Sequence, residues 1–300
     1  MKKRKNITES SNPNSNDIDV KNIREIIQIF HNDNLEILDG LNNVLDEINN
    51  IVELTIECLK NNGRLFYVGA GTSGRLGVLD AAECKPTFGV DDGMVEGIIA
   101  GGKNALFMSI EGAEDNIDEV EDIIDGYNIS KNDIIIGISC SGTASFVLEF
   151  LKQTKNIGSK TVLITFNEID DVNYIDQLLS VHVGPEIITG STRMKSGTAT
   201  KMILNMISSI SMIKLNKTYG NYMVDLKVIN KKLIKRGIHI IKSITGVDSK
   251  KAKILLEESN GYVKNAIVME KLNISFLESK LLLNQYSGSL REILDKGDIR

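Results

Sequence analysis

The stretch RLFYVGAGTSGRLGVLDAAEC, residues 64–84, decides the fold. It begins with an apolar, partly aromatic run that is typical of a buried strand and continues with helical spacing. Gly69-Ala-Gly-Thr-Ser-Gly74 joins the two and satisfies the G-x-G-x-x-G pattern of a dinucleotide-binding turn. Such a turn attracts anions because glycines let the backbone approach closely and free N–H groups face the ligand at a helix N-terminus. The pattern alone also fits a tight turn without a ligand.

Four further apolar runs follow the first one, with helix-like segments between them. They span residues 94–102, 133–142, 159–166 and 178–184. Continuous apolar strands that alternate with helices predict a parallel sheet covered on both faces. A long, mostly apolar helix is expected over 193–215, and two or three short helices over 249–294. The predicted class is therefore α/β, a doubly wound parallel sheet with flanking helices and a small C-terminal helical bundle.

The N-terminal part has a different pattern. Residues 1–17 are polar without periodicity, so we expect an extended arm, and residues 18–60 have helical spacing that predicts two helices broken near residues 31–34. The chain thus divides into an arm with helices (1–54), the α/β domain (55–220) and the helical C-terminal domain (221–300).

The composition narrows the class of protein. The chain has 300 residues, 42% of them hydrophobic, which is enough for a full core. A net charge of −5 gives no electrostatic support for a nucleic-acid partner. The three cysteines form no C-x-x-C pair and indicate free thiols in a reducing compartment. No apolar run approaches the ~20 residues that span a membrane. A soluble, cytoplasmic protein without a membrane partner is expected.

Hydroxyl side chains favour a sugar phosphate over a dinucleotide. A dinucleotide site needs an acid at the end of the second strand, which here ends in IIAGG, residues 98–102. Thr72 and Ser73 lie in the first glycine turn, and Ser139 and Ser141 follow the strand over 133–142. The carboxyl ends of parallel strands share one edge, so these hydroxyls are expected to converge on one phosphate. Each serine taken alone also fits a local turn or a helix cap.

Glu83 follows the glycine turn on the predicted helix. It shares one face with Leu76 and Leu79, so we expect desolvation to favour its protonated form, which suits a general acid. A structural pair between Glu83 and Arg75 or a lysine is the alternative. Lys85-Pro86 is expected to end the helix, because a residue before proline disfavours helical geometry.

Other charged residues near the carboxyl edge of the predicted sheet are candidate catalytic or anion-binding residues. Glu111 and Glu114 lie in EGAEDN, residues 111–116, although such clusters are usually solvated helix starts. Arg193 and Lys195 begin the long apolar helix and indicate a possible anion site. The histidines lack metal-ligand spacing, so no metal site is predicted.

Five stretches together closely resemble the N-acetylmuramic acid 6-phosphate etherase family, and the resemblance runs through nearly the whole chain. They are VGAGTSGRLGVLDAAEC (68–84), IIAGG (98–102), EGAED (111–115), VGPEIITGSTRMKSGTA (183–199) and YGNYMVDL (219–226). The resemblance implies a sugar isomerase (SIS) domain over about 55–220, a helical C-terminal domain and a homodimer.

The resemblance also implies a reaction, the release of D-lactate from the sugar ether to leave N-acetylglucosamine 6-phosphate, without a metal or cofactor. It implies that Glu83 protonates the departing lactate and that Glu114 removes the proton at C2. The chain departs from the family pattern at Thr143-Ala-Ser145, where the family usually has Arg-Thr-Pro. This change removes a basic group beside the Ser139–Ser141 turn, where the phosphate is expected to bind. A SIS-fold sugar-phosphate isomerase and a non-catalytic sugar-phosphate regulator are the alternatives.

Overall fold

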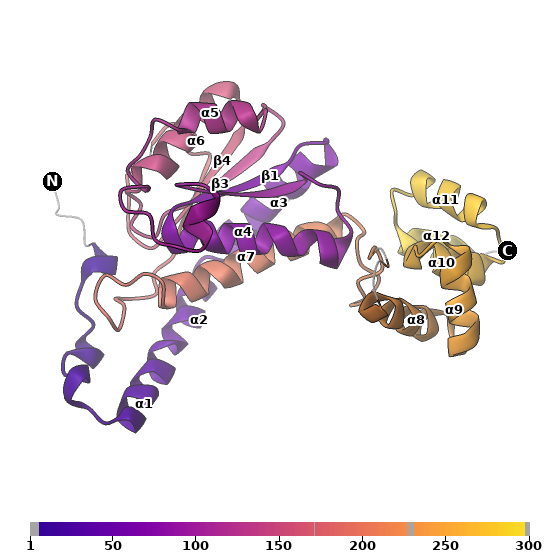
Figure 1. Cartoon of the computed structure of the whole chain (residues 1–300), viewed down its shortest axis with the longest axis horizontal. Helices are drawn as coiled ribbons and strands as arrows, with labels where there is room; N and C mark the ends of the chain where they lie inside the picture. Colours follow the sequence, from indigo (N-terminus) through magenta and orange to yellow (C-terminus); the bar gives the residue numbers. More distant parts are fainter. Residues whose placement is uncertain (1–5, 171, 227, 229–230, 298–300) are drawn as a thin grey trace. The chain divides into compact units, whose positions relative to one another are not determined.

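The computed structural model describes residues 6–170, 172–226, 228 and 231–297. The chain consists of two compact units, which are described in turn. The first comprises Met1–Ala82 and Gly93–Ser208, and the second comprises Glu83–Asp92 and Ser209–Arg300. Figure 1 shows the course of the chain.

The first unit is built on a five-stranded parallel sheet with the strand order β2-β1-β3-β4-β5. The strands are β1 (Leu65–Gly69), β2 (Val95–Ile99), β3 (Ile134–Ile138), β4 (Lys160–Thr165) and β5 (Gln177–Ser180). Four of them lie within the predicted runs, and β5 begins one residue before its run, so the predicted sheet is confirmed. β1 lies between β2 and β3, and Gly69 is paired with Ile99 and Ile138 at the carboxyl edge.

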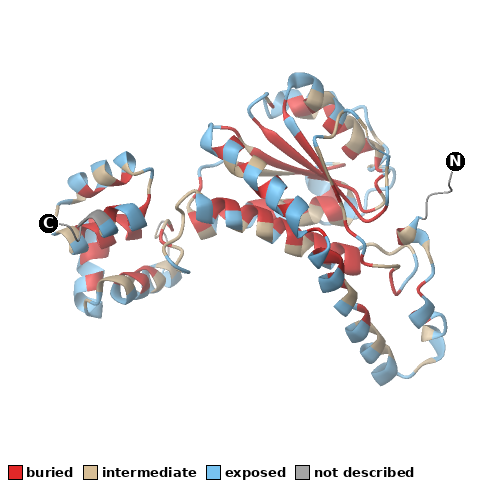
Figure 2. Cartoon of the chain, turned by 180° about the vertical axis from the view of Figure 1, so that it is seen from behind, coloured by how far each residue is buried: buried red, intermediate tan, exposed pale blue. Residues whose placement is uncertain are grey.

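Helices cover both faces of this sheet (Figure 1). On one face lie α5 (Val120–Gly126) and α6 (Ser145–Ile157), whose Phe146 and Phe150 share a buried cluster with Phe66 and Ile135. On the other lie α3 (Leu45–Lys60), α4 (Gly71–Phe88) and α7 (Lys195–Lys214). Every residue of β1 and β3 is buried, as Figure 2 shows, because each strand has a hydrophobic layer on both sides.

Helix α4 packs on the sheet through small residues. A Cβ on Gly77 would lie 2.8 Å from Tyr67 Cβ, and one on Gly97 would lie 2.5 Å from Val78 Cα. Both positions therefore need glycine so that the helix backbone can approach the strands. The predicted end of this helix at Lys85-Pro86 was wrong. The proline removes one hydrogen bond, but the helix continues to Phe88.

The N-terminal segment differs from the predicted extended arm. It forms three short 3₁₀ turns, η1 (Ile7–Glu9), η2 (Pro13–Ser15) and η3 (Ile18–Val20), and it buries Thr8, Asn12 and Ser15. Helices α1 (Ile23–Asp33) and α2 (Leu35–Asn42) follow, before α3. The predicted break near residues 31–34 is present, and a second break before α3 was missed.

The second unit contains five helices after residue 230 within its described part. They are α8 (Lys231–Thr245), α9 (Ser249–Glu258), α10 (Val263–Leu272), α11 (Phe276–Gln285) and α12 (Leu290–Gly297). Residues 249–294 thus hold four helices rather than the predicted two or three. Asn273, at a φ of 52°, ends α10 in the left-handed conformation, and Asn260 and Gly261, at φ of 53° and 81°, follow the end of α9. Residues 263–269 of α10 are all buried at the centre of this unit's core.

None of the helices in the described ranges combines the length and the apolarity that a membrane span requires.

Candidate active site

The two hydroxyl-bearing turns lie side by side at the carboxyl edge of the sheet. The first, Gly69–Gly74, follows β1, and the second, Ser139–Thr143, follows the neighbouring β3. Ser73 Oγ lies 3.6 Å from Cys140 Sγ, which joins the two turns directly. Ser73 and Ser139 are buried, and Ser141 is partly exposed. The structure therefore brings the two predicted turns together through Ser73 and Cys140.

The serines of the second turn also make the local bonds that the sequence left open as an alternative. Ser139 Oγ accepts a hydrogen bond from Ala144 N at 3.2 Å. Ser141 Oγ accepts one from Thr143 N at 3.2 Å and lies 2.8 Å from Thr143 Oγ1. These bonds use hydroxyl lone pairs, and a hydroxyl that accepts can still donate its own hydrogen to an anion. Local turn bonding and phosphate binding are thus compatible at these serines.

The loop that carries Glu114 is docked on the same edge. Phe146 N, in the first turn of α6, donates to the Glu114 carbonyl oxygen at 2.9 Å, and Ser145 Oγ donates to Asp115 Oδ1 at 3.4 Å. Because α6 follows the Ser139–Thr143 turn directly, these bonds fix the Glu114 loop next to that turn. The Glu114 side chain is exposed, so its carboxylate is accessible to a ligand.

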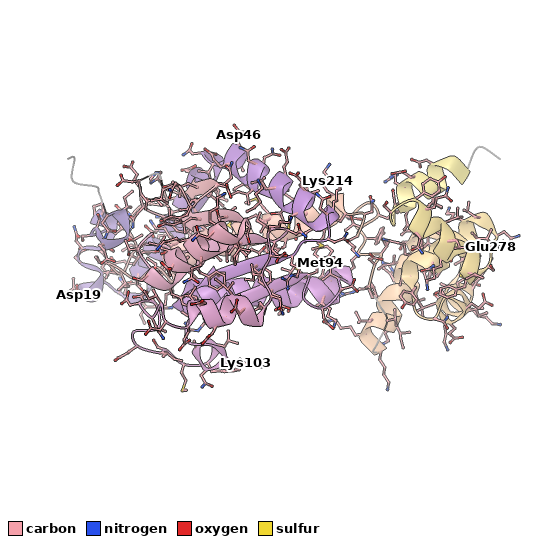
Figure 3. The ribbon with its side chains drawn as sticks, turned by 90° about the horizontal axis from the view of Figure 1, so that it is seen from above. Asp19, Asp46, Met94, Lys103, Lys214 and Glu278 are labelled. Atoms are coloured by element: carbon pink, nitrogen blue, oxygen red, sulfur yellow. The ribbon has the colours of Figure 1, made fainter. Side chains whose placement is uncertain are left out.

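Arg75 was missed as a site residue by the sequence analysis, which considered it as a partner of Glu83. It lies in the first turns of α4, and its Nε donates to the Leu106 carbonyl at 3.3 Å while its Nη2 donates to the Met108 carbonyl at 3.0 Å. These carbonyls belong to the exposed segment that begins at Lys103, labelled in Figure 3, and leads to the Glu114 loop. Arg75 therefore fastens this segment to α4.

Glu83 is exposed in the single chain. The prediction that an apolar helix face desolvates this carboxyl was therefore wrong for the chain on its own. Leu79 on the same face is 46% exposed. The buried face of α4 runs instead through Ser73, Gly77 and Cys84. The periodicity of leucines misled the prediction because close helix–sheet packing selects small residues on the face that is buried.

The start of α7, a predicted anion site, holds a carboxylate of the protein itself. Glu186 is fully buried and accepts hydrogen bonds from Lys195 N at 2.9 Å, Ser196 N at 2.9 Å and Ser196 Oγ at 2.8 Å. The first-turn N–H groups that would attract a phosphate are therefore used by Glu186.

Lys195 is likewise engaged inside the chain. Its Nζ lies 3.0 Å from Asp33 Oδ1 and 2.7 Å from Glu36 Oε2, and its side chain is only 1% exposed. Asn12 Nδ2 donates to the same Asp33 oxygen at 2.8 Å. Lys195 thus joins α7 to the N-terminal helices, whereas the neighbouring Arg193 is exposed. No local sequence signal marks these partners, since they lie about 160 positions away.

Asn167, which the sequence analysis did not single out, ties the N-terminal segment to the second hydroxyl turn. Its Nδ2 lies 3.1 Å from the Ser141 carbonyl oxygen and 2.9 Å from both Asn6 Oδ1 and Thr8 Oγ1. Its Oδ1 accepts from Thr8 N at 3.2 Å. The segment that was expected to be an extended arm is therefore part of the structure around the Ser141 turn.

Comparison with known proteins agrees with this architecture. The N-terminal SIS domain of glucokinase regulatory protein, as a family model, matches residues 47–155, and the C-terminal lid domain of the same protein matches residues 220–275. The parallel sheet, the paired turns at its carboxyl edge and these matches define a SIS-type α/β protein with a helical C-terminal region.

Full-length relatives then identify the family. The chain is 43% identical to the N-acetylmuramic acid 6-phosphate etherase of Clostridium acetobutylicum over 97% of this chain and 96% of the relative. It is also 43% identical to etherase 1 of Bacillus licheniformis, covering 96% and 95%, and to the etherase of Oceanobacillus iheyensis, covering 95% and 97%. The chain belongs to the N-acetylmuramic acid 6-phosphate etherase family.

Proposed function

We propose that this protein cleaves the D-lactyl ether of N-acetylmuramic acid 6-phosphate to N-acetylglucosamine 6-phosphate and D-lactate, in the catabolism of cell-wall amino sugars. Family membership supports the substrate. The observation that carries the assignment is the joining of three elements at one edge, where Ser73 meets Cys140 and Phe146 holds the Glu114 loop. The three widely spaced cysteines, which form no C-x-x-C pair, favour a reducing, cytoplasmic setting.

The proposed chemistry is an elimination followed by a hydration. The opened sugar has an aldehyde at C1, so the proton at C2 is acidic, and Glu114 removes it as the base. The C3–O bond then breaks, and Glu83 protonates the departing lactate oxygen. Glu83 next removes a proton from a water that adds at C3 of the unsaturated aldehyde, and Glu114 returns a proton to C2. One carboxyl must be ionised while the other is protonated at the same pH. No metal or cofactor takes part.

We place the phosphate at the paired turns, with Thr72, Ser73, Ser139 and Ser141 as hydroxyl ligands and the N-terminus of α4 as the anion-attracting element. The exposed Arg193 stays a candidate for a further contact. Lys195 is the weakest member of the predicted set, because two carboxylates already engage its ammonium group.

A homodimer is part of the proposal. Ten residues of one continuous helix separate Glu83 from Ser73, which corresponds to about 15 Å along its axis. A phosphate held at Ser73 and an acid at Glu83 of the same chain would lie far apart for one sugar. A second copy of the chain that supplies its own Glu83 would complete the site, and the exposed Leu79 beside Glu83 suits such an apolar contact.

The decisive experiment incubates the purified chain with N-acetylmuramic acid 6-phosphate and assays D-lactate. Glu83→Ala should abolish lactate release and still exchange the C2 proton with deuterated solvent, whereas Glu114→Ala should lose the exchange as well. Absence of lactate together with tight sugar-phosphate binding would contradict the enzymatic function, and exchange at the wild-type rate in Glu114→Ala would remove Glu114 from the role of base.

A further inference from the structure

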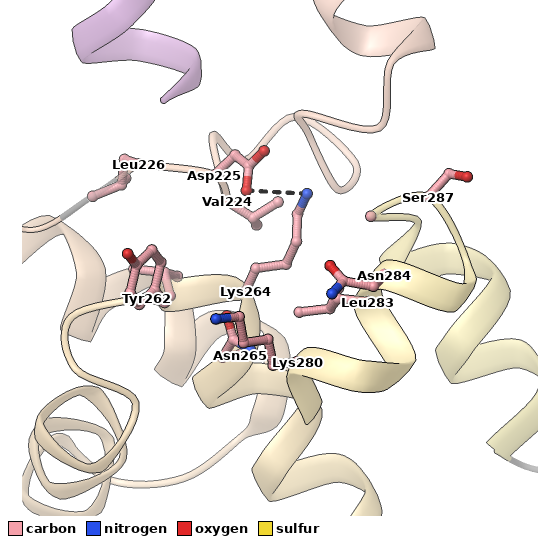
Figure 4. Close-up of a pocket in the computed structure, with 12 residues that line it drawn as sticks. Val224, Asp225, Leu226, Tyr262, Lys264, Asn265, Lys280, Leu283, Asn284 and Ser287 are labelled. Atoms are coloured by element: carbon pink, nitrogen blue, oxygen red, sulfur yellow. Dashed lines mark ion pairs between the residues drawn. The ribbon is translucent and has the colours of Figure 1, made fainter. Parts of the chain in front are cut away.

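The helical unit contains a cavity of about 550 Å³ that the proposed reaction does not use. Pockets for small molecules typically fall between about 300 and 1,000 Å³. The walls come from the segment before α8, from the start of α10 and from α11 with the loop that follows it (Figure 4). They consist of Val224, Asp225, Leu226, Tyr262, Val263, Lys264, Asn265, Lys280, Leu283, Asn284, Ser287 and Gly288.

Positive charge exceeds negative charge around this cavity. Lys264 Nζ lies 3.2 Å from Asp225 Oδ1 and 2.9 Å from the Asn216 carbonyl oxygen. The other oxygen of Asp225 lies 2.9 Å from Lys217 Nζ, so two ammonium groups share one carboxylate. Lys280 adds a second ammonium group to the wall. The lining alone carries a charge of +1, and together with Lys217, which pairs with Asp225, the local charge is +2 in a chain whose net charge is −5.

The buried ammonium of Lys264 is the central group. Its side chain is 7% exposed, and Figure 4 shows it between Asp225 and the loop of Ser287. Burial lowers the pKa of Lys264, Asp225 opposes this shift, and Lys217 adds to it. A Cβ on Gly288 would lie 3.3 Å from Lys264 Nζ, so glycine leaves this side of the ammonium uncovered. An anion in the cavity would supply the balancing charge that Asp225 divides between two lysines.

We propose that this cavity is a second ligand site, which binds the phosphate group of a small phosphorylated metabolite between Lys264 and Lys280. A phosphate monoester carries about −1.5 to −2 charges at neutral pH, which matches the local excess, and lysine is a common point-charge ligand of phosphate. Asn284 and Ser287 offer neutral hydrogen-bonding groups at the rim, and Leu283 and Tyr262 offer apolar surface for the carbon skeleton. The bound phosphate competes with Asp225 for Lys264.

The test is isothermal titration of the full chain with N-acetylglucosamine 6-phosphate, inorganic phosphate and unphosphorylated N-acetylglucosamine. We expect the sugar phosphate to show two classes of site per chain, inorganic phosphate to bind the second class weakly, and the unphosphorylated sugar to bind it at least tenfold more weakly than the sugar phosphate. Hydrogen exchange should show protection of residues 262–265 and 280–288 on binding. Absence of protection at residues 262–265 and 280–288, protection confined to residues 69–74 and 139–143, or equal binding of the unphosphorylated sugar would overturn the proposal.

Variants locate the site. Lys280 is exposed, so Lys280→Glu should fold normally and weaken the second class of site about tenfold or more, and Lys264→Met should abolish it. Lys253→Glu makes the same charge change on an exposed lysine outside the cavity and should leave both classes within twofold. Equal effects of the 280 and 253 substitutions would contradict the proposal. Lactate release is measured separately, so a failure of the etherase assignment does not affect this outcome.

Discussion

Lys195 provides a direct test of whether a lysine in the family motif acts on the ligand or on the fold. Replacing it by methionine removes the ammonium group and leaves Asp33, whose side chain is 2% exposed, without its counter-charge. Breaking a buried ion pair from one side costs about 3–5 kcal/mol. Glu36 adds little to that cost, because its side chain is 45% exposed and water can solvate it. A change of 1 kcal/mol shifts the unfolding midpoint of a folding unit of this size by about 2–4 °C.

We therefore expect Lys195→Met to lower the unfolding midpoint by roughly 6–20 °C in calorimetry or circular dichroism. Adding Asp33→Asn removes the unpaired charge and keeps an oxygen that can accept from Asn12, so the double variant should recover at least half of the loss. Lys60→Met, on an exposed lysine of α3, is the matched control and should change the midpoint little. A stable Lys195→Met protein with a KM raised more than tenfold would refute the structural role and restore the phosphate-binding one.

Three further predictions concern the site and its surroundings. Arg75→Met should reduce C2 exchange and lactate release together by about tenfold or more, since charged hydrogen bonds contribute about 1.5–3 kcal/mol, and an unchanged exchange rate would contradict the anchoring role. Mixing inactive Glu83→Ala and Glu114→Ala chains should restore about a quarter of the wild-type activity in a random dimer population, because only a site shared between subunits is repaired. No recovery after verified subunit exchange would place both acids in one chain. Burial raises the pKa of Cys58 to about 12 and that of Cys140 above its ordinary value, so both stay protonated at pH 8 and should react with a thiol reagent only after unfolding. Rapid labelling of the native protein would contradict this.

The sheet was predictable because buried parallel strands are continuous apolar runs, and all five runs became strands. The pairing of the glycine turn with the Ser139–Ser141 turn followed from the rule that parallel strands share one edge. The orientation of α4 was not predictable from apolar periodicity, since its buried face runs through Ser73, Gly77 and Cys84 rather than through leucines. The end of α4 was also not predictable from Pro86, because a proline in the last turn of a helix removes only one hydrogen bond and the helix can continue past it.

Charge partners were the other part that the sequence could not supply. Arg193 and Lys195 look alike as cations at a helix start, yet one is exposed and the other is enclosed by carboxylates from α1 and α2. In the same way, Glu186 looks like an ordinary acid in the sequence but caps α7 from inside the unit. These pairings depend on how distant segments meet, and no local spacing rule encodes them.

The bond between Asn167 and the N-terminal segment has a consequence for the order in which the chain folds during synthesis. Thr8 leaves the ribosome early, but its partner lies 159 positions later. At 5–20 residues per second, roughly 8–30 s pass before Asn167 is even made. During that interval Asn6 and Thr8 lack this partner, and this segment should be open to proteases. Asn6 and Thr8 are thus fixed to the Ser141 turn only after a residue made about 160 positions later.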